Sequence, residues 1–128
     1  MGFTKFNANP KGNKTGDCGI RAVAVATGLG WDRAYEQLVA VGFVMKLDYS
    51  DPIVMEKVLI DNGFSVGKVV ASKGSRRPKV FEMAEEHPNW NCVLRVANHY
   101  VATYKGNYVD TWDSGDKSVY KYWYKPQI

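Results

Sequence analysis

The stretch NKTGDCGIRAVAVATG, residues 13–28, leads from polar coil into an apolar run with helical spacing. From Ile20 onward the apolar residues recur at intervals of three and four, so they fall on one face of a helix. Gly28 follows this run, and glycine commonly ends a helix. We therefore predict a helix over residues 18–27, with Cys18 in its first turn.

Three further helices are predicted downstream: a periodic segment from Asp32 to Gly42, a segment that begins at Ser50-Asp51-Pro52 and ends near Gly63, and the short stretch VFEMAEEHP, residues 80–88. The middle segment is favoured as a helix by an aspartate at the N-cap and a proline in the first turn. The helical patterns end by residue 88.

The segments after residue 90 are rich in valine, tyrosine and tryptophan, alternate in polarity, and are separated by turn-forming residues. They are NCVLRVA (91–97), HYVATYKGNYVDTW (99–112) and SVYKYWYK (118–125). We predict that residues 91–124 form consecutive antiparallel strands, that SVGKVV (65–70) adds another strand, and that residues 1–16 are an irregular lead-in. Helices first and an antiparallel sheet last indicate an α+β fold.

The composition limits the class of protein. With 128 residues, of which 45% are apolar, the chain is long enough for one compact domain and too short for two, so residues 1–128 are taken as a single domain. The first residues lack the apolar core of a signal peptide, and no apolar run approaches the ~20 residues that span a bilayer. We expect a cytoplasmic protein without a membrane partner.

The charged residues give little support for a nucleic-acid partner. The formal net charge is +4, and the positive residues are scattered except at KGSRRPK, residues 73–79. Lys73, Arg76, Arg77 and Lys79 most simply form a solvated loop, so nucleic acid is not expected to bind. The sequence does not indicate an oligomeric state.

The two cysteines, Cys18 and Cys92, are predicted to be free thiols. A cytosolic chain is kept reduced, and no Cys-x-x-Cys or Cys/His spacing suggests zinc, so neither a metal nor a cofactor is expected. Cys18 faces the unpaired N–H groups and the positive end of its helix, which favour thiolate over thiol. Gly19 beside it would let a substrate approach closely. The alternative is that Cys18 is simply a small buried apolar residue.

A nucleophilic thiol needs a histidine partner, and His99 is the candidate because it begins an alternating strand. His87, the other histidine, lies at a predicted helix end beside a proline, where an exposed side chain is the ordinary reading. A lone strand histidine is also often structural, so the role of His99 depends on whether the fold brings it to Cys18.

A carboxylate should orient the imidazole, and the next strand offers Asp110 and Asp113. A two-residue loop at residues 105–106 makes His99 and Asp110 diagonal neighbours on one sheet face. A three-residue loop would reverse the parity and favour Asp113. A loop at residues 106–107 would keep Asp110 on that face but move it along the strand. Asp110 is ranked first as the partner of His99. An aspartate that does not bond His99 would be an ordinary turn or strand-end residue.

An oxyanion formed during acyl transfer needs hydrogen-bond donors. The backbone N–H of Cys18 is one, and the side-chain amide of Asn13, five residues earlier, is a possible second, unless Asn13 is a plain loop residue. Asp17 would repel an oxyanion, so we expect it to cap the helix or to steer a substrate amine.

The aromatic segment 108–125 holds two of the four tryptophans and four of the eight tyrosines. Core and cross-strand packing is the favoured explanation. The functional alternative is that Trp112, between the two aspartates, shields the hydrogen bond between His99 and Asp110 from water.

The order Cys, His, Asp, with the cysteine opening the first helix and the other two on adjacent strands, resembles the papain-like cysteine peptidase superfamily. Within it, GDCGIRAVAVATG and NHYVATYKGNYVDTWDS are similar to small papain-fold proteins of bacteria and their phages, akin to bacteriocin-processing peptidases, over about residues 12–124. The resemblance implies that Cys18 is the nucleophile, His99 the base and Asp110 the orienting acid. Relatives commonly carry a glutamine five or six residues before the cysteine, where this chain has Asn13 or Gly12.

The resemblance implies a thiol-dependent hydrolase that cleaves a peptide, isopeptide or amide bond of a protein or peptide substrate. The same triad would also serve amide transfer or deamidation. A third hypothesis is a non-catalytic phage or bacterial binding protein built on a papain-like scaffold.

Overall fold

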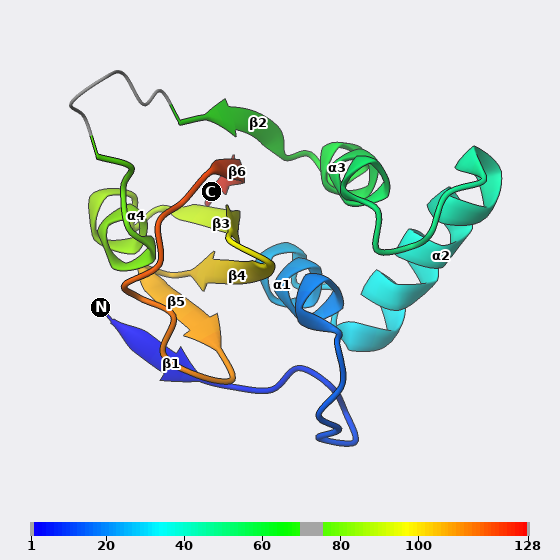
Figure 1. The fold of residues 1–128 in the computed structure, drawn as a ribbon, viewed down its shortest axis with the longest axis horizontal. Coiled ribbons are helices and arrows are strands. Elements are labelled where there is room, and N and C mark those ends of the chain that lie inside the picture. Colours follow the sequence, from blue (N-terminus) through cyan, green and yellow to red (C-terminus); the bar gives the residue numbers. More distant parts are fainter. Residues whose placement is uncertain (1, 70–75, 128) are drawn as a thin grey trace.

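Strands from both ends of the chain meet in one mixed sheet in the computed structural model, which describes residues 2–69 and 76–127 (Figure 1). The described elements are β1 (Phe3–Lys5), α1 (Cys18–Thr27), α2 (Trp31–Met45), α3 (Pro52–Asp61), β2 (Ser65–Lys68), α4 (Val80–Glu86), β3 (Trp90–Val96), β4 (His99–Tyr104), β5 (Asn107–Asp110) and β6 (Lys121–Pro126). The predicted α+β class is confirmed. None of the described helices is long and apolar enough to cross a membrane.

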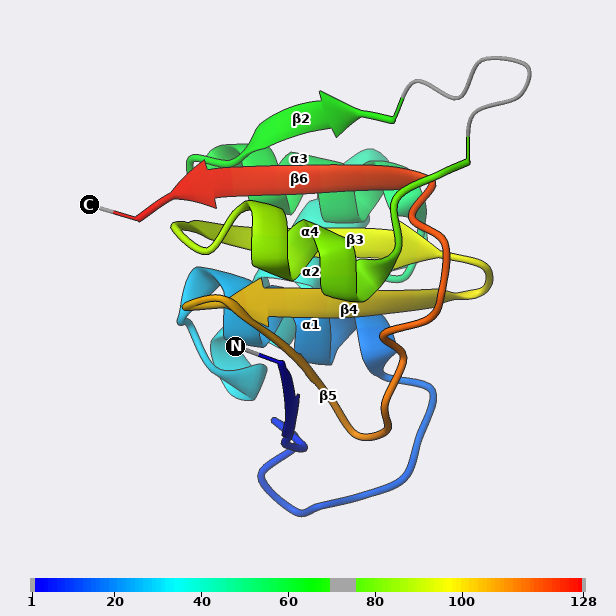
Figure 2. The same ribbon diagram turned by 90° about the vertical axis from the view of Figure 1, so that its left-hand side faces the viewer.

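The strands lie in the order β1-β5-β4-β3-β6-β2. As predicted, β3, β4 and β5 are consecutive antiparallel neighbours. The prediction for residues 91–124 is wrong for the last strand, because β6 crosses to the far side of β3 instead of pairing with β5. β2 pairs with β6 at that edge, as Figure 2 shows. The strand predicted over residues 65–70 is confirmed for Ser65–Lys68, and residue 70 lies outside the described residues.

The prediction of an irregular lead-in over residues 1–16 is wrong at Phe3–Lys5. These residues form β1 and pair in parallel with β5, with Phe3 opposite Tyr108. Three residues are too few to show a period-two pattern, and the strand exists because the edge of β5 is available to pair with it. The lead-in is thereby held against the end of the sheet that carries Asp110.

The last strand also begins later than predicted, at Lys121 rather than at Ser118. The N–H of Val119 donates to the carbonyl of Pro78, and Ser118 forms an isolated bridge with Lys79. The chain between β5 and β6 is therefore tied to the start of α4 before it enters the sheet.

Helices cover both faces of the sheet, with α1 and α3 on one face and α4 on the other (Figure 2), and α2 packs against α1 and α3. The face under α1 and α3 buries Val93, Ala102 and Trp123. The opposite face buries alternate positions, including Leu94 and Val101, against α4. Both sides of the central strands are therefore removed from water, and the apolar surface buried there stabilises the fold.

Helix α1 begins at Cys18, which confirms the predicted helix over residues 18–27 and the place of the cysteine in its first turn. Gly28 ends the helix with a φ of 75°, in the left-handed region that glycine adopts readily. The buried face consists of small and β-branched residues, which let the helix pack closely on the sheet: Ile20, Ala22, Val23, Ala24 and Ala26. The other three helices occur where predicted, although α2 extends to Met45.

Candidate active site

The N-terminus of α1 lies against the start of β4, and this brings Cys18 to His99. The partly exposed thiol faces the His99 ring and the backbone N–H of Tyr100, and its interactions with both favour the ionised form. β4 begins at His99, immediately after a turn in which Asn98 has a positive φ of 55°. The sulfur therefore contacts the first two residues of the strand.

The hairpin of β4 and β5 brings Asp110 to the other side of the imidazole. Nε2 of His99 lies 2.6 Å from Oδ2 of Asp110. Tyr104 pairs with Asn107, so the loop consists of residues 105–106 as predicted. Both loop residues have positive φ, which fits a tight turn that matches the twist of the strands. Because Nε2 is bonded to Asp110, Nδ1 is the ring nitrogen left for Cys18.

Asp113, the alternative partner of His99, bonds elsewhere. It accepts hydrogen bonds from the hydroxyl of Tyr108 at 2.7 Å and from the backbone N–H of Gly115 at 3.0 Å. A Cβ at Gly115 would lie 2.4 Å from the Tyr108 hydroxyl, so this turn closes too tightly for a larger residue. Asp113 therefore shapes the turn after β5, and Asp110 is the carboxylate that faces His99.

Asp110 is itself held in place by two donors that sequence reasoning missed. Oδ1 accepts from the backbone N–H of Thr111 at 2.7 Å, and Oδ2 accepts from the Ser114 hydroxyl at 2.9 Å. The carboxylate is buried, at 5% relative exposure. The only signal in the sequence was a serine four residues after the aspartate, in a segment with several turn-forming residues.

The electrostatics favour a thiolate beside an imidazolium. Burial alone would raise the pKa of Cys18, but the hydrogen bonds from His99 and Tyr100 and the charges of His99 and Arg21 lower it below its usual value. Burial would lower the pKa of His99, but its bonds to Asp110 and Cys18 raise it to about 9. Burial also opposes ionisation of Asp110, and the bond to His99 leads the effects that bring its pKa below the ordinary value. The three shifts all favour the charged forms, with an anionic sulfur and an anionic carboxylate on either side of a cationic ring.

Asp17 does not cap α1, contrary to the prediction, although it occupies the N-cap position. Its carboxylate is 2% exposed and forms an ion pair with Arg21. It also accepts from Nε1 of Trp31 at 2.9 Å and from Nδ2 of Asn9 at 3.2 Å. Steering of a substrate amine stays a prediction, although three partners already share this carboxylate.

The absence of a side-chain cap leaves the first N–H groups of α1 available. Within residues 2–69 and 76–127, no side chain caps this helix, so the N–H groups of Cys18 and Gly19 have no helical partner. Asn13 is exposed in the preceding loop and does not line either of the two small pockets that Cys18 lines. Asn13 therefore stays a prediction as the second donor, and Gly19 offers another backbone N–H without a helical partner.

Trp112 lies beside the imidazole but is not a core residue. Its ring centroid is 5.0 Å from that of His99, and the side chain is 44% exposed. The favoured explanation of core packing is thus wrong for Trp112, although it holds for Trp123, which is 1% exposed. A large ring at this position covers one side of His99, as the functional alternative requires.

A cavity of about 70 Å³ opens at Cys18 between α1, α3 and the loop before α3. Its apolar lining includes Tyr49, Met55 and Tyr100. A Cβ on Gly19 would lie 3.2 Å from Sδ of Met55, so this glycine permits close packing against α3 rather than an open approach from solvent.

Other candidate residues lie outside the site. Cys92 is free and buried, and burial raises its pKa to about 11, in contrast to Cys18. Arg76 forms two hydrogen bonds with Glu82, and Arg77 stacks over the ring of Tyr120. Lys73 lies outside the described residues. Among the described side chains, no group of three or more His, Cys, Asp or Glu is placed to hold a metal ion.

No family model, no curated protein and no solved structure matches this chain. A function for this chain therefore has to be inferred from the geometry of the site.

Proposed function

We propose that the protein is a papain-like, thiol-dependent hydrolase that cleaves a peptide, isopeptide or amide bond through Cys18, His99 and Asp110. The observation that carries this proposal is the place of the His99 imidazole, which interacts with the Cys18 sulfur and lies 2.6 Å from the Asp110 carboxylate. A structural histidine needs one partner, whereas this one links a helix-terminal thiol to a buried carboxylate.

The acylation step follows from the charges. The Cys18 thiolate attacks the carbonyl carbon of the substrate, a C–S bond forms, and the carbonyl electron pair moves to oxygen. The N–H groups of Cys18 and Gly19 donate to this oxyanion. When the oxyanion collapses, the C–N bond breaks, and the His99 imidazolium gives its proton to the departing amine. The product of this step is a thioester on Cys18.

Deacylation uses the same groups in reverse. His99, now neutral, removes a proton from water, and the resulting hydroxide equivalent attacks the thioester carbon. Collapse breaks the C–S bond and releases the carboxylic acid, and the thiolate–imidazolium pair is restored. An amine in place of water would give transfer instead of hydrolysis, and the acylation half of the reaction would be the same.

The test is a substrate panel with peptide, isopeptide and glutamine-amide bonds, followed by intact mass spectrometry and product analysis. We expect an acyl adduct on Cys18 with one class of substrate, loss of adduct and product in Cys18→Ala, and retention of both in Cys92→Ala. Product formation by Cys18→Ala would contradict the proposal. Absence of an adduct with all classes would favour a binding scaffold.

A further inference from the structure

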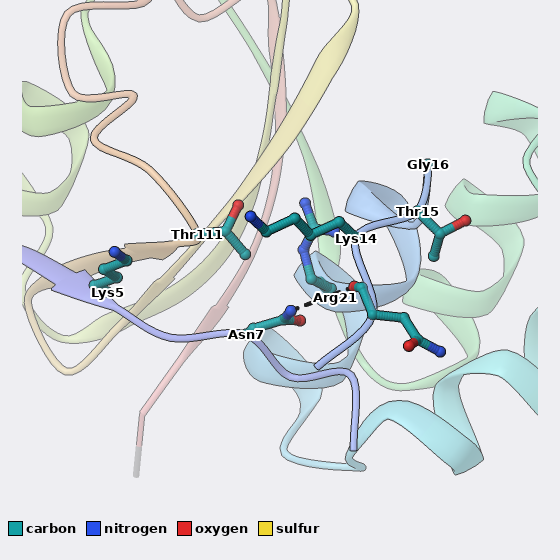
Figure 3. Close-up of a pocket in the computed structure, with 8 residues that line it drawn as sticks. Lys5, Asn7, Lys14, Thr15, Gly16, Arg21 and Thr111 are labelled. Atoms are coloured by element: carbon teal, nitrogen blue, oxygen red, sulfur yellow. Dashed lines mark hydrogen bonds between the residues drawn. The ribbon is translucent and has the colours of Figure 1, made fainter. Parts of the chain in front are cut away.

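A pocket of about 630 Å³ lies beside the candidate active site (Figure 3). Its walls come from β1, from the loop before α1, from α1 itself and from Thr111, the residue after Asp110. Three of its eight lining residues are cationic, namely Lys5, Lys14 and Arg21, and none is acidic. We call it the cationic pocket. Figure 3 shows these side chains around Thr111.

The positive charge of the pocket is only partly compensated by neighbouring carboxylates. Arg21 is neutralised by its ion pair with buried Asp17. Lys5 and Lys14 are exposed and have no carboxylate within 4 Å among the residues that the structure describes. Asp110, the nearest carboxylate in sequence to Thr111, is buried and bonded to His99. The pocket therefore presents two unpaired ammonium groups.

The cationic pocket adjoins the two small pockets at the sulfur. Gly16 lines both this pocket and the 70 Å³ cavity at Cys18. Arg21 lines both this pocket and a narrow pocket of about 10 Å³ that is bounded by Cys18 and Asp110. A peptide bound with its carbonyl at Cys18 would therefore reach the cationic pocket within a short length of chain, since an extended chain advances ~3.3 Å per residue.

We propose that the cationic pocket selects substrates with a carboxylate side chain one or two residues from the bond that Cys18 attacks, with Lys5 and Lys14 as the specificity-determining residues. This inference rests on the proposed function and names its substrate class as an acidic peptide. The asparagine and threonine side chains that line the pocket add hydrogen-bond donors for a carboxylate. The fit to the active site favours a carboxylate on a peptide over a phosphate, although both are anions.

The test uses matched electrophilic peptides, so that no natural substrate is needed. Iodoacetyl-glycyl-glutamic acid amide and iodoacetyl-glycyl-glutamine amide have nearly the same shape, differ in the charge of one side chain, and both alkylate a thiol. At low salt we expect the acidic probe to alkylate Cys18 about tenfold faster than its neutral counterpart, with the ratio falling as salt screens the charges. Lys5→Gln with Lys14→Gln should bring the ratio close to one.

The matched control is Lys57→Gln with Lys68→Gln, which removes the same net charge from α3 and β2. These lysines are exposed and lie away from the cationic pocket, so the ratio should stay as in the wild type. Lys5→Glu with Lys14→Glu should reverse the preference in favour of the neutral probe. A wild-type ratio near one, or equal losses in the Lys5/Lys14 and Lys57/Lys68 double variants, would overturn the inference.

Failure of the proposed function and failure of the proposed specificity give different results. If iodoacetamide reacts with Cys18 at pH 6 no faster than with an ordinary thiol, the proposed function fails, whatever the probe ratio. If iodoacetamide reacts rapidly but the ratio is unaffected by the lysine substitutions, only the specificity fails. Stronger protection of Cys18 by a single-stranded oligonucleotide than by a glutamate-rich peptide of equal charge would identify a phosphate site and overturn the acidic-peptide assignment.

Discussion

His99 and Asp110 are joined at 2.6 Å across a hairpin whose two-residue loop fixes their register. This bond does more than orient a ring, because it supports the imidazolium charge that lowers the pKa of Cys18. Asp110 is therefore expected to act on the sulfur through His99, although it does not touch the sulfur.

Asp110→Asn should lower the pKa of His99 from about 9 toward the ordinary value of about 6.5, because the amide carries no charge to stabilise the imidazolium. Turnover should fall by about 100-fold or more. NMR titration of the His99 ring measures the pKa. Asp113→Asn is the matched control, and a larger shift from it than from Asp110→Asn would contradict the assignment.

The pH dependence of turnover should be bell-shaped. The reactive form needs the Cys18 thiolate, whose pKa is lowered, so activity rises on the acid side below the usual range for a thiol. It also needs the His99 imidazolium, so activity falls as pH rises through about 9. Rates measured from pH 4 to 10 check this, and activity that climbs steadily to pH 10 would show that the imidazolium is not required.

Ser114→Ala should weaken the site without abolishing it. Its hydroxyl donates to Oδ2 of Asp110 at 2.9 Å, and one such bond is worth about 1 kcal/mol. We expect a several-fold loss in turnover and a small change in the His99 pKa, because the aspartate is free to turn away. Ser114→Thr keeps the hydroxyl and should restore the pKa. Identical losses in both variants would indicate a packing effect.

Asp17→Ala should destabilise the fold by about 3 kcal/mol. It leaves Arg21, Trp31 and Asn9 without their shared acceptor in a buried site. Urea denaturation measures the change. Asp61→Ala, which removes an exposed pair with Lys57, is the control and should cost less than about 1 kcal/mol. Equal costs would mean that the buried network contributes little.

Local patterns predicted the parts of the structure that local interactions determine. The start of α1 at Cys18 and the loop at residues 105–106 followed from apolar spacing and turn-forming residues. The pairing of β6 with β3 could not be predicted from these patterns, because it depends on which edge of β3 is free after the hairpin has formed. The hydrogen bond from Trp31 to Asp17 could not be predicted from these patterns either, because Trp31 belongs to another helix. Long-range contacts therefore mark the limit of the sequence patterns.

The most direct test of the thiolate–imidazolium pair is the rate of Cys18 alkylation by iodoacetamide between pH 5 and 9. We predict rapid reaction at pH 6, loss of that acid-side reactivity in His99→Ala, and no reaction at buried Cys92 in the folded protein, where the pKa is about 11. A rate that falls about tenfold per pH unit below ~8.5, as for an ordinary cysteine, would contradict the pair and with it the proposed chemistry.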